Sequence, residues 1–275
     1  MTPKSDVKVK KLRKPPTSGP ILLENRDNTI CYLNSALNLL YTIKKIRHHL
    51  ETGDLKNDVI LKEIKEIFNR RKRSARKLVN LLNMRHGAQS CHEVVKKIVR
   101  LLPPDIQCSL SLQHQKMTRC EKCGEKLLPR KKMVQSVEIL LPEDKPYTLK
   151  RLLVNQSTPR SCTKYREVQE VFDVYRVTVD SKTMIVNVLQ SDPMEIKNLD
   201  TDGVMEVFGG KWILRAAIIY LPDTNRKYDY GENGHSISWT KHGQKWYRVS
   251  DDKSEEFEKF DASRLDVEMM IFERV

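Results

Sequence analysis

The chain has 275 residues, 39% of them hydrophobic, and carries a formal net charge of +14. This length suits one large domain with a sizeable core. No apolar run approaches the roughly 18 residues of a membrane span, and the N-terminal segment lacks the hydrophobic centre of a secretory signal. We therefore expect an intracellular protein, cytoplasmic or nuclear, that does not enter membranes.

The positive charge is concentrated in segments 1–19 and 61–77. Such basic runs attract phosphates, acidic proteins or anionic surfaces through long-range fields. Neither segment contains interleaved aromatic residues for base stacking, so solvated segments are favoured over nuclear targeting or nucleic-acid binding. We expect 1–19 to be a basic, disordered tail.

Helices are predicted from Cys31 to about Leu102, because apolar residues recur there at helical spacing. Pro103-Pro104 closes the last of them. The apolar positions form three groups: Leu33, Ala36, Leu37, Leu40, Ile43 and Leu50; Leu61, Ile64 and Phe68; and Val94, Val95, Ile98, Leu101 and Leu102.

Short β-rich runs dominate from about Met133 onward, separated by Pro, Gly, Asn and Asp. Helices that precede a largely antiparallel sheet predict an α+β protein with two lobes, and a cleft between lobes is a usual place for a site. The runs are MVQSVEILL, EVFDVYRVTV, MIVNVLQ, WILRAAIIY, HSISW, KWYRV and EMMIFERV.

The six cysteines are irregularly spaced, which favours reduced thiols over a disulfide framework. Cys31 begins a predicted helix, where the helix dipole and unpaired backbone N–H groups stabilise a thiolate. A cysteine in such a position is more often an apolar filler, so this feature alone does not assign catalysis.

A histidine near the C-terminal end supplies the second part of a candidate site. His235 opens a strand, and the turn KHGQ predicts a hairpin that brings His235 close to Ser250 and Asp251. A base and its orienting partner need this arrangement. Cys31 and His235 are therefore the candidate nucleophile and base.

The stretch NTICYLNSALNLL resembles the cysteine box of the ubiquitin-specific proteases, which are papain-like deubiquitinases. QSCHEVVKKIVRLL, GHSISW, KWYRVSDD and EMMIFERV are similar to later motifs of that family, in the same order. The resemblance covers 20–275. It implies a helical thumb (20–104) packed on a β-rich palm with short fingers (105–275). It also implies a thiol-dependent deubiquitinase, monomeric and without cofactor, that holds ubiquitin or a ubiquitinated protein between the lobes.

Two departures from the family pattern concern the catalytic machinery. The position of the family's oxyanion-hole asparagine is occupied by Arg26, and Asn25 or Asn28 is the alternative donor, with Asn25 preferred. The family's third catalytic residue corresponds to Ser250, and Asp251 follows it. A serine orients the imidazole, whereas Asp251 would also supply charge. These departures leave a catalytically inactive ubiquitin-binding module as the alternative function.

Two further motifs concern metal binding and helix capping. CEKC (Cys120, Cys123) keeps one half of the family's zinc finger, but the other half has only Cys162, so a metal-free finger with less than one equivalent of zinc is expected. Cys108 or His114 is the candidate replacement ligand. In QSCHEV, Ser90 and Glu93 form a capping box, which favours a structural role for His92.

Overall fold

The structure is a computed structural model. It describes residues 19–55, 57–84, 90–122, 124–140, 148–154, 157–162, 168–189, 203–221, 234–260 and 266–275. The predicted tail, 1–19, lies outside these ranges except for Gly19. Across the described ranges, no helix is both long enough and apolar enough to cross a membrane.

Helices fill the first part of the chain, as predicted, and continue to Ser109. The long first helical segment is divided, because α1 ends at Tyr41 and a new helix starts at Lys44. The helices are α1 (Cys31–Tyr41), α2 (Lys44–Thr52), α3 (Val59–Phe68), α4 (Arg76–Leu81), α5 (Cys91–Leu101), α6 (Pro104–Ser109) and α7 (Leu149–Val154).

Helix ends follow from local chemistry. Asp58 caps α3 by accepting the Leu61 N–H at 2.8 Å, and Ser90 caps α5 by accepting the His92 N–H at 3.2 Å. Ser90 is thus the N-cap, as predicted, but its hydroxyl accepts from His92 and not from the Glu93 N–H that a capping box uses. Leu102 is extended before Pro103, which ends α5.

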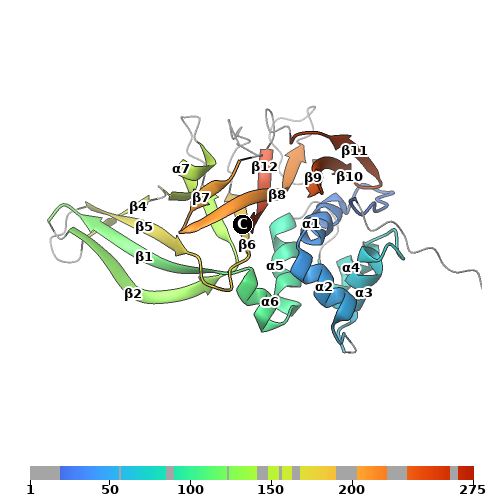
Figure 1. Cartoon of the computed structure of the whole chain (residues 1–275), viewed down its shortest axis with the longest axis horizontal. Coiled ribbons are helices and arrows are strands. Elements are labelled where there is room, and N and C mark those ends of the chain that lie inside the picture. Colours follow the sequence, from blue (N-terminus) through green and yellow to red (C-terminus); the bar gives the residue numbers. More distant parts are fainter. Residues whose placement is uncertain are drawn as a thin grey trace, which may run out of the picture.

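Two sheets follow the helices, an eight-stranded one and a four-stranded one. Figure 1 shows the four-stranded sheet reaching away from the helices. It has the order β2-β1-β5-β4, made of β1 (Leu112–Cys120), β2 (Gly124–Val134), β4 (Ser157–Ser161) and β5 (Val168–Arg176). The larger sheet has the order β11-β10-β9-β8-β12-β6-β3, with β7 paired to β8. Its strands are β3 (Val137–Leu140), β6 (Thr183–Leu189), β7 (Met205–Val207), β8 (Gly210–Leu221), β9 (His235–His242), β10 (Lys245–Ser250), β11 (Lys253–Phe257) and β12 (Asp266–Arg274).

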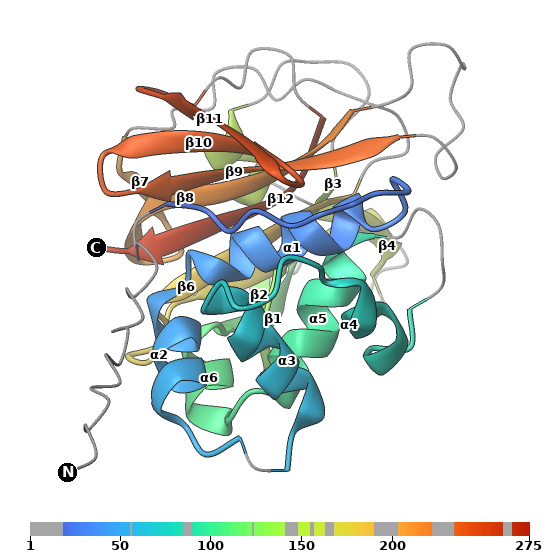
Figure 2. The same ribbon diagram turned by 90° about the vertical axis from the view of Figure 1, so that its right-hand side faces the viewer.

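The central strands of the large sheet are buried on both faces. Residues 216–219 of β8 alternate between two apolar clusters. Ala216 and Ile218 belong to the cluster that includes the helices, whereas Ala217 and Ile219 belong to the cluster that includes the three tryptophans Trp212, Trp239 and Trp246. Helix α1 lies across this sheet in Figure 2, and all eleven of its residues are buried. The helix that carries Cys31 is therefore central to the fold.

Candidate active site

Cys31 is the first residue of α1 and is only 7% exposed. The backbone N–H groups of Ser236, on β9, and of Tyr32 interact with its sulfur. Ser35, one turn further along α1, donates its hydroxyl to the Ser236 carbonyl at 2.9 Å. The start of α1 and the start of β9 thus meet at this thiol.

The surroundings of Cys31 raise the pKa of its thiol. Burial is the largest cause, and the Asp251 carboxylate adds to it, while the backbone N–H groups act in the opposite direction. The backbone N–H groups at the helix start favour the thiolate, as expected, but burial outweighs them and the pKa of the thiol is raised. A nucleophilic role for Cys31 requires a neighbouring base.

His235 is the first residue of β9 and is joined to Ser250 through the β9–β10 hairpin. The hairpin turns at Gly243, which has a φ of 63° that suits glycine. His235 Nε2 lies 2.8 Å from Ser250 Oγ and 3.8 Å from Asp251 Oδ2. The predicted proximity is confirmed, with Ser250 as the direct hydrogen-bond partner. Since Nε2 faces Ser250, Nδ1 is the ring nitrogen that remains for a different partner.

Asp251 is held in place from three sides. Its φ of 52° turns the chain just after β10. Asn34 Nδ2 donates to Oδ1 at 2.7 Å, Asn25 Nδ2 donates to Oδ2 at 3.1 Å, and Leu23 N–H donates to the backbone carbonyl at 3.0 Å. Only 11% of the side chain is exposed. The carboxylate is thereby fixed close to the imidazole.

The two asparagines predicted for the oxyanion hole differ in position. Asn25 belongs to the site: its Oδ1 accepts the Ile30 N–H at 3.2 Å, and its amide nitrogen donates to Asp251, which leaves one amide hydrogen. Asn28 is exposed, with a φ of 55°, and its N–H donates to the Asn25 carbonyl at 3.3 Å. The oxyanion role stays a prediction for both.

Sequence reasoning did not find the roles of Asn34 and Ser35. Both are buried on α1 and both hydrogen-bond across the site. The signal was present, because a polar side chain on a helix that is apolar all round has to find a partner inside the protein.

A carboxyl group lies beside Cys91. Glu268 occupies the β-bulge in β12, where the register with β8 shifts between Val267 and Met269. It hydrogen-bonds the Cys91 thiol, and among the described residues its Oε2 has no partner. Burial raises the pKa of both side chains. Cys91 Sγ is also 3.4 Å from the Tyr32 carbonyl oxygen, which is the alternative acceptor for its single proton, so Cys91 is a packed thiol.

Within the described ranges, the candidate zinc ligands are not all brought together. Cys120 ends β1, and Cys162 follows β4 at the same end of the four-stranded sheet, while Cys123 lies outside the described residues. His114 lies six residues before Cys120 on β1, which is roughly 20 Å along a strand. Its Nε2 forms a hydrogen bond with the Asp173 carboxylate.

Cys108 is exposed on α6, before the opposite end of β1. His114 and Cys108 are therefore wrong as replacement ligands. In the described ranges no group of metal-ligating side chains is close enough to hold an ion. The zinc content stays a prediction.

Among known proteins, only solved structures match this chain. No protein-family model matches the chain, and no curated protein matches it. A solved structure of the SAGA DUB module of Ubp8, Sgf11, Sus1 and Sgf73 contains a chain that is 12% identical, with a TM-score of 0.69; the match covers 94% of this chain and 69% of that one.

A second structure of this module, bound to monoubiquitin, matches at 13% identity and a TM-score of 0.68, covering 98% of this chain and 73% of that one. Identities this low carry information on fold and not on activity. The protein thus shares its fold with chains of these two solved structures.

Proposed function

We propose that the chain is a cysteine deubiquitinase, which hydrolyses the isopeptide bond between the C-terminal glycine of ubiquitin and a lysine. The observation that carries the proposal is the contact of His235 with Ser250, next to the Ser236 N–H that meets the Cys31 sulfur. On this proposal 20–104 is the thumb and 105–275 forms the palm and fingers of a papain-like domain.

The first half of the reaction acylates the enzyme. His235 Nδ1 takes the thiol proton as the Cys31 sulfur attacks the glycine carbonyl, which is the activation that a thiol of raised pKa requires. The imidazolium then gives this proton to the lysine nitrogen, so the amine leaves and a thioester remains. Asp251 stabilises the imidazolium by its charge and Ser250 orients the ring.

The second half releases ubiquitin. Water attacks the thioester carbonyl while His235 takes a proton from it, and the proton passes to the sulfur as the carboxylic acid product leaves. The backbone N–H of Cys31 and the remaining amide hydrogen of Asn25 are the proposed donors to the oxyanion in both halves.

A ubiquitin probe with a C-terminal electrophile tests the proposal. The wild-type protein should form a covalent adduct, Cys31→Ala should not, and Cys108→Ala should behave as wild type because Cys108 is an exposed thiol outside the site. An adduct that persists in Cys31→Ala would overturn the assignment of the nucleophile.

The inactive ubiquitin-binding module is the second candidate function. It is favoured by Asn25, whose amide is engaged with Asp251 and Ile30. The same experiment separates the two: a folded wild type that binds monoubiquitin without forming an adduct would identify the inactive module.

A further inference from the structure

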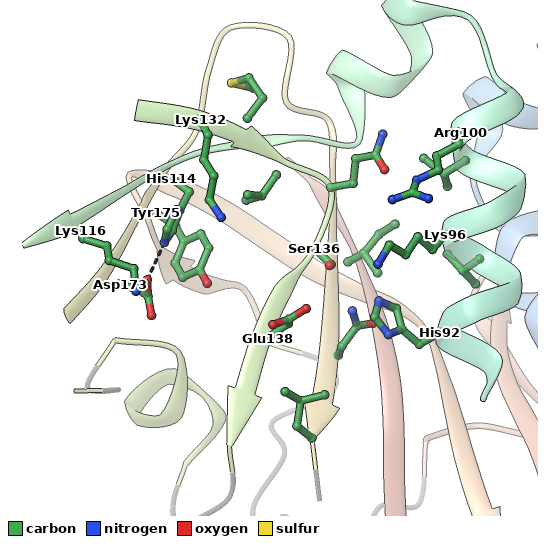
Figure 3. Close-up of a pocket in the computed structure, with 18 residues that line it drawn as sticks. His92, Lys96, Arg100, His114, Lys116, Lys132, Ser136, Glu138, Asp173 and Tyr175 are labelled. Atoms are coloured by element: carbon green, nitrogen blue, oxygen red, sulfur yellow. Dashed lines mark hydrogen bonds and ion pairs between the residues drawn. The ribbon is translucent and has the colours of Figure 1, made fainter. Parts of the chain in front are cut away.

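A cavity of about 600 Å³ lies between α5 and the four-stranded sheet, and residues of β3 and β6 also line it. Figure 3 shows side chains from both sides converging on it: Lys96 and Arg100 from α5, and Lys132 from β2. The basic segments found in the sequence do not include these three residues. The cavity is thus a separate concentration of positive charge.

The cations of this cavity outnumber its carboxylates. Lys96, Arg100 and Lys132 are exposed, and within the part of the chain that the structure describes they make no ion pair. Lys116, also in the lining, lies 4.0 Å from Asp173. That carboxylate is also hydrogen-bonded to His114, and the lining's only other acid among the described residues is Glu138. Three positive charges are therefore available to a ligand.

An amide at the wall of the cavity also lacks partners. Asn187, on β6, is 1% exposed and lines the cavity. Neither its Nδ2 nor its Oδ1 has a hydrogen-bond partner among the described residues. A buried amide without partners costs free energy, so this side chain favours a polar ligand at the wall.

The cavity begins beside the catalytic centre. The first residue of α5, Cys91, has its Sγ 3.4 Å from the Tyr32 carbonyl oxygen next to the nucleophile, and the second, His92, already lines the cavity. Lys96 and Arg100 follow at intervals of four residues on the same side of the helix, so the lining extends about 12 Å along α5. A folded protein whose C-terminal tail reaches Cys31 can therefore extend along α5 over this cavity.

We propose that the cavity binds an acidic face of the modifier that is cleaved, so that the enzyme prefers ubiquitin-fold modifiers with carboxylates on that face. The inference rests on the proposed function and specifies its substrate class. Complementary charge of this kind selects partners and raises association rates.

The lining disfavours nucleic acid as the occupant. Single strands bind on exposed aromatic platforms, whereas the Tyr175 ring in this cavity packs against His114 and Phe208, with centroids 5.0 Å and 5.2 Å away. Glu138 and Asp173 would repel a phosphate backbone. A folded protein can pair its carboxylates with the cations of the cavity and can donate hydrogen bonds from amides or hydroxyls to these two acids.

Two chemically matched ubiquitin probes test the proposal. In one the surface lysines are acetylated and in the other succinylated, so both block the same amines but only succinylation adds negative charge. We expect the succinylated probe to label Cys31 about tenfold faster than the acetylated probe at low salt, with the ratio falling as salt rises. In the double variant Lys96→Glu/Arg100→Glu the ratio should fall to one or below. Lys62→Glu is the control, because it reverses a charge at an exposed position of α3, outside the cavity. In this variant the succinylated probe should still label much faster than the acetylated probe.

A double variant that keeps the wild-type ratio while still being labelled would overturn the proposal and leave the proposed function intact. If neither probe nor unmodified ubiquitin probe labels the wild type, the proposed function itself fails, and the cavity proposal with it. A short RNA whose binding is lost in the double variant, while the probe ratio stays unchanged, would also overturn the proposal in favour of nucleic acid.

Discussion

The imidazole of His235 bonds to Ser250 and not to Asp251: Nε2 is 2.8 Å from the serine oxygen and 3.8 Å from the nearer carboxylate oxygen. The hydroxyl therefore sets the direction of the ring. Asp251, which two asparagine amides hold in place, contributes its charge from slightly further away.

Separate substitutions distinguish the hydroxyl from the charge. Ser250→Ala removes a neutral hydrogen bond, of about 1 kcal/mol, whereas Asp251→Asn removes charge stabilisation of about 1.5–3 kcal/mol. We expect the turnover of a ubiquitin substrate to fall on the order of fivefold for Ser250→Ala and on the order of tenfold more for Asp251→Asn. A larger loss for Ser250→Ala would show that Ser250, and not Asp251, is the third catalytic residue.

Asn34 should act on the catalytic centre through Asp251. Its amide donates to the carboxylate at 2.7 Å and to the Leu23 carbonyl at 3.3 Å. Asn34→Ala should lower the free energy of unfolding by about 1.5–3 kcal/mol, as for a buried hydrogen bond to a charged group, and should also lower turnover per folded molecule.

Urea denaturation and turnover at a temperature where the variant is fully folded would measure both effects. Asn80→Ala, at an exposed position of α4, is the matched control. Reduced stability with unchanged turnover would mean that Asp251 keeps its position without Asn34.

His242 should make the protein sensitive to acid. Burial, with Arg47 and Arg70 nearby, lowers the pKa of His242 from 6.5 to about 4, and its Nε2 has no partner among the described residues. Between these pH values the unfolded chain binds a proton that the folded chain does not, so the free energy of unfolding falls as the pH falls through this window. The loss from neutral pH to about pH 4 should be on the order of 3 kcal/mol.

Urea unfolding at several pH values would measure this contribution. His242→Gln should flatten the dependence below neutral pH, whereas His48→Gln, at an exposed position on α2, should leave it unchanged. An unaltered slope in His242→Gln would show that other groups cause the acid sensitivity.

The sequence predicted the elements that are buried and periodic. The helices from Cys31 to Leu101 were found because each turns an apolar face to the core, and the β9–β10 hairpin because its strands flank a glycine turn. Strand β2 was missed, except at its end, because its side chains are mostly exposed and carry no apolar alternation. Its pairing with β1 depends on backbone hydrogen bonds, which leave no trace in the residue pattern.

The candidate site was predicted in its residues but not in its geometry. Cys31 and His235 could be identified because their positions at element starts have a chemical meaning. The proximity of Ser250 to the imidazole followed from the hairpin, but the left-handed turn at Asp251 and its bonds to Asn25 and Asn34 join residues more than 200 positions apart. No local pattern encodes contacts over such a separation.

The order in which the site is assembled follows from where its parts lie in the chain. The thiol of Cys31 and the helix that carries it are made early in synthesis, whereas His235, Ser250 and Asp251 belong to the last strands of the sheet. In a nascent chain that ends before β9, Cys31 exists while His235 and the strand that packs against α1 do not. The thiol can therefore meet this imidazole only after residues 235–251 have been made, so a nascent chain that stops before them carries Cys31 without the side chains that surround it in the folded protein.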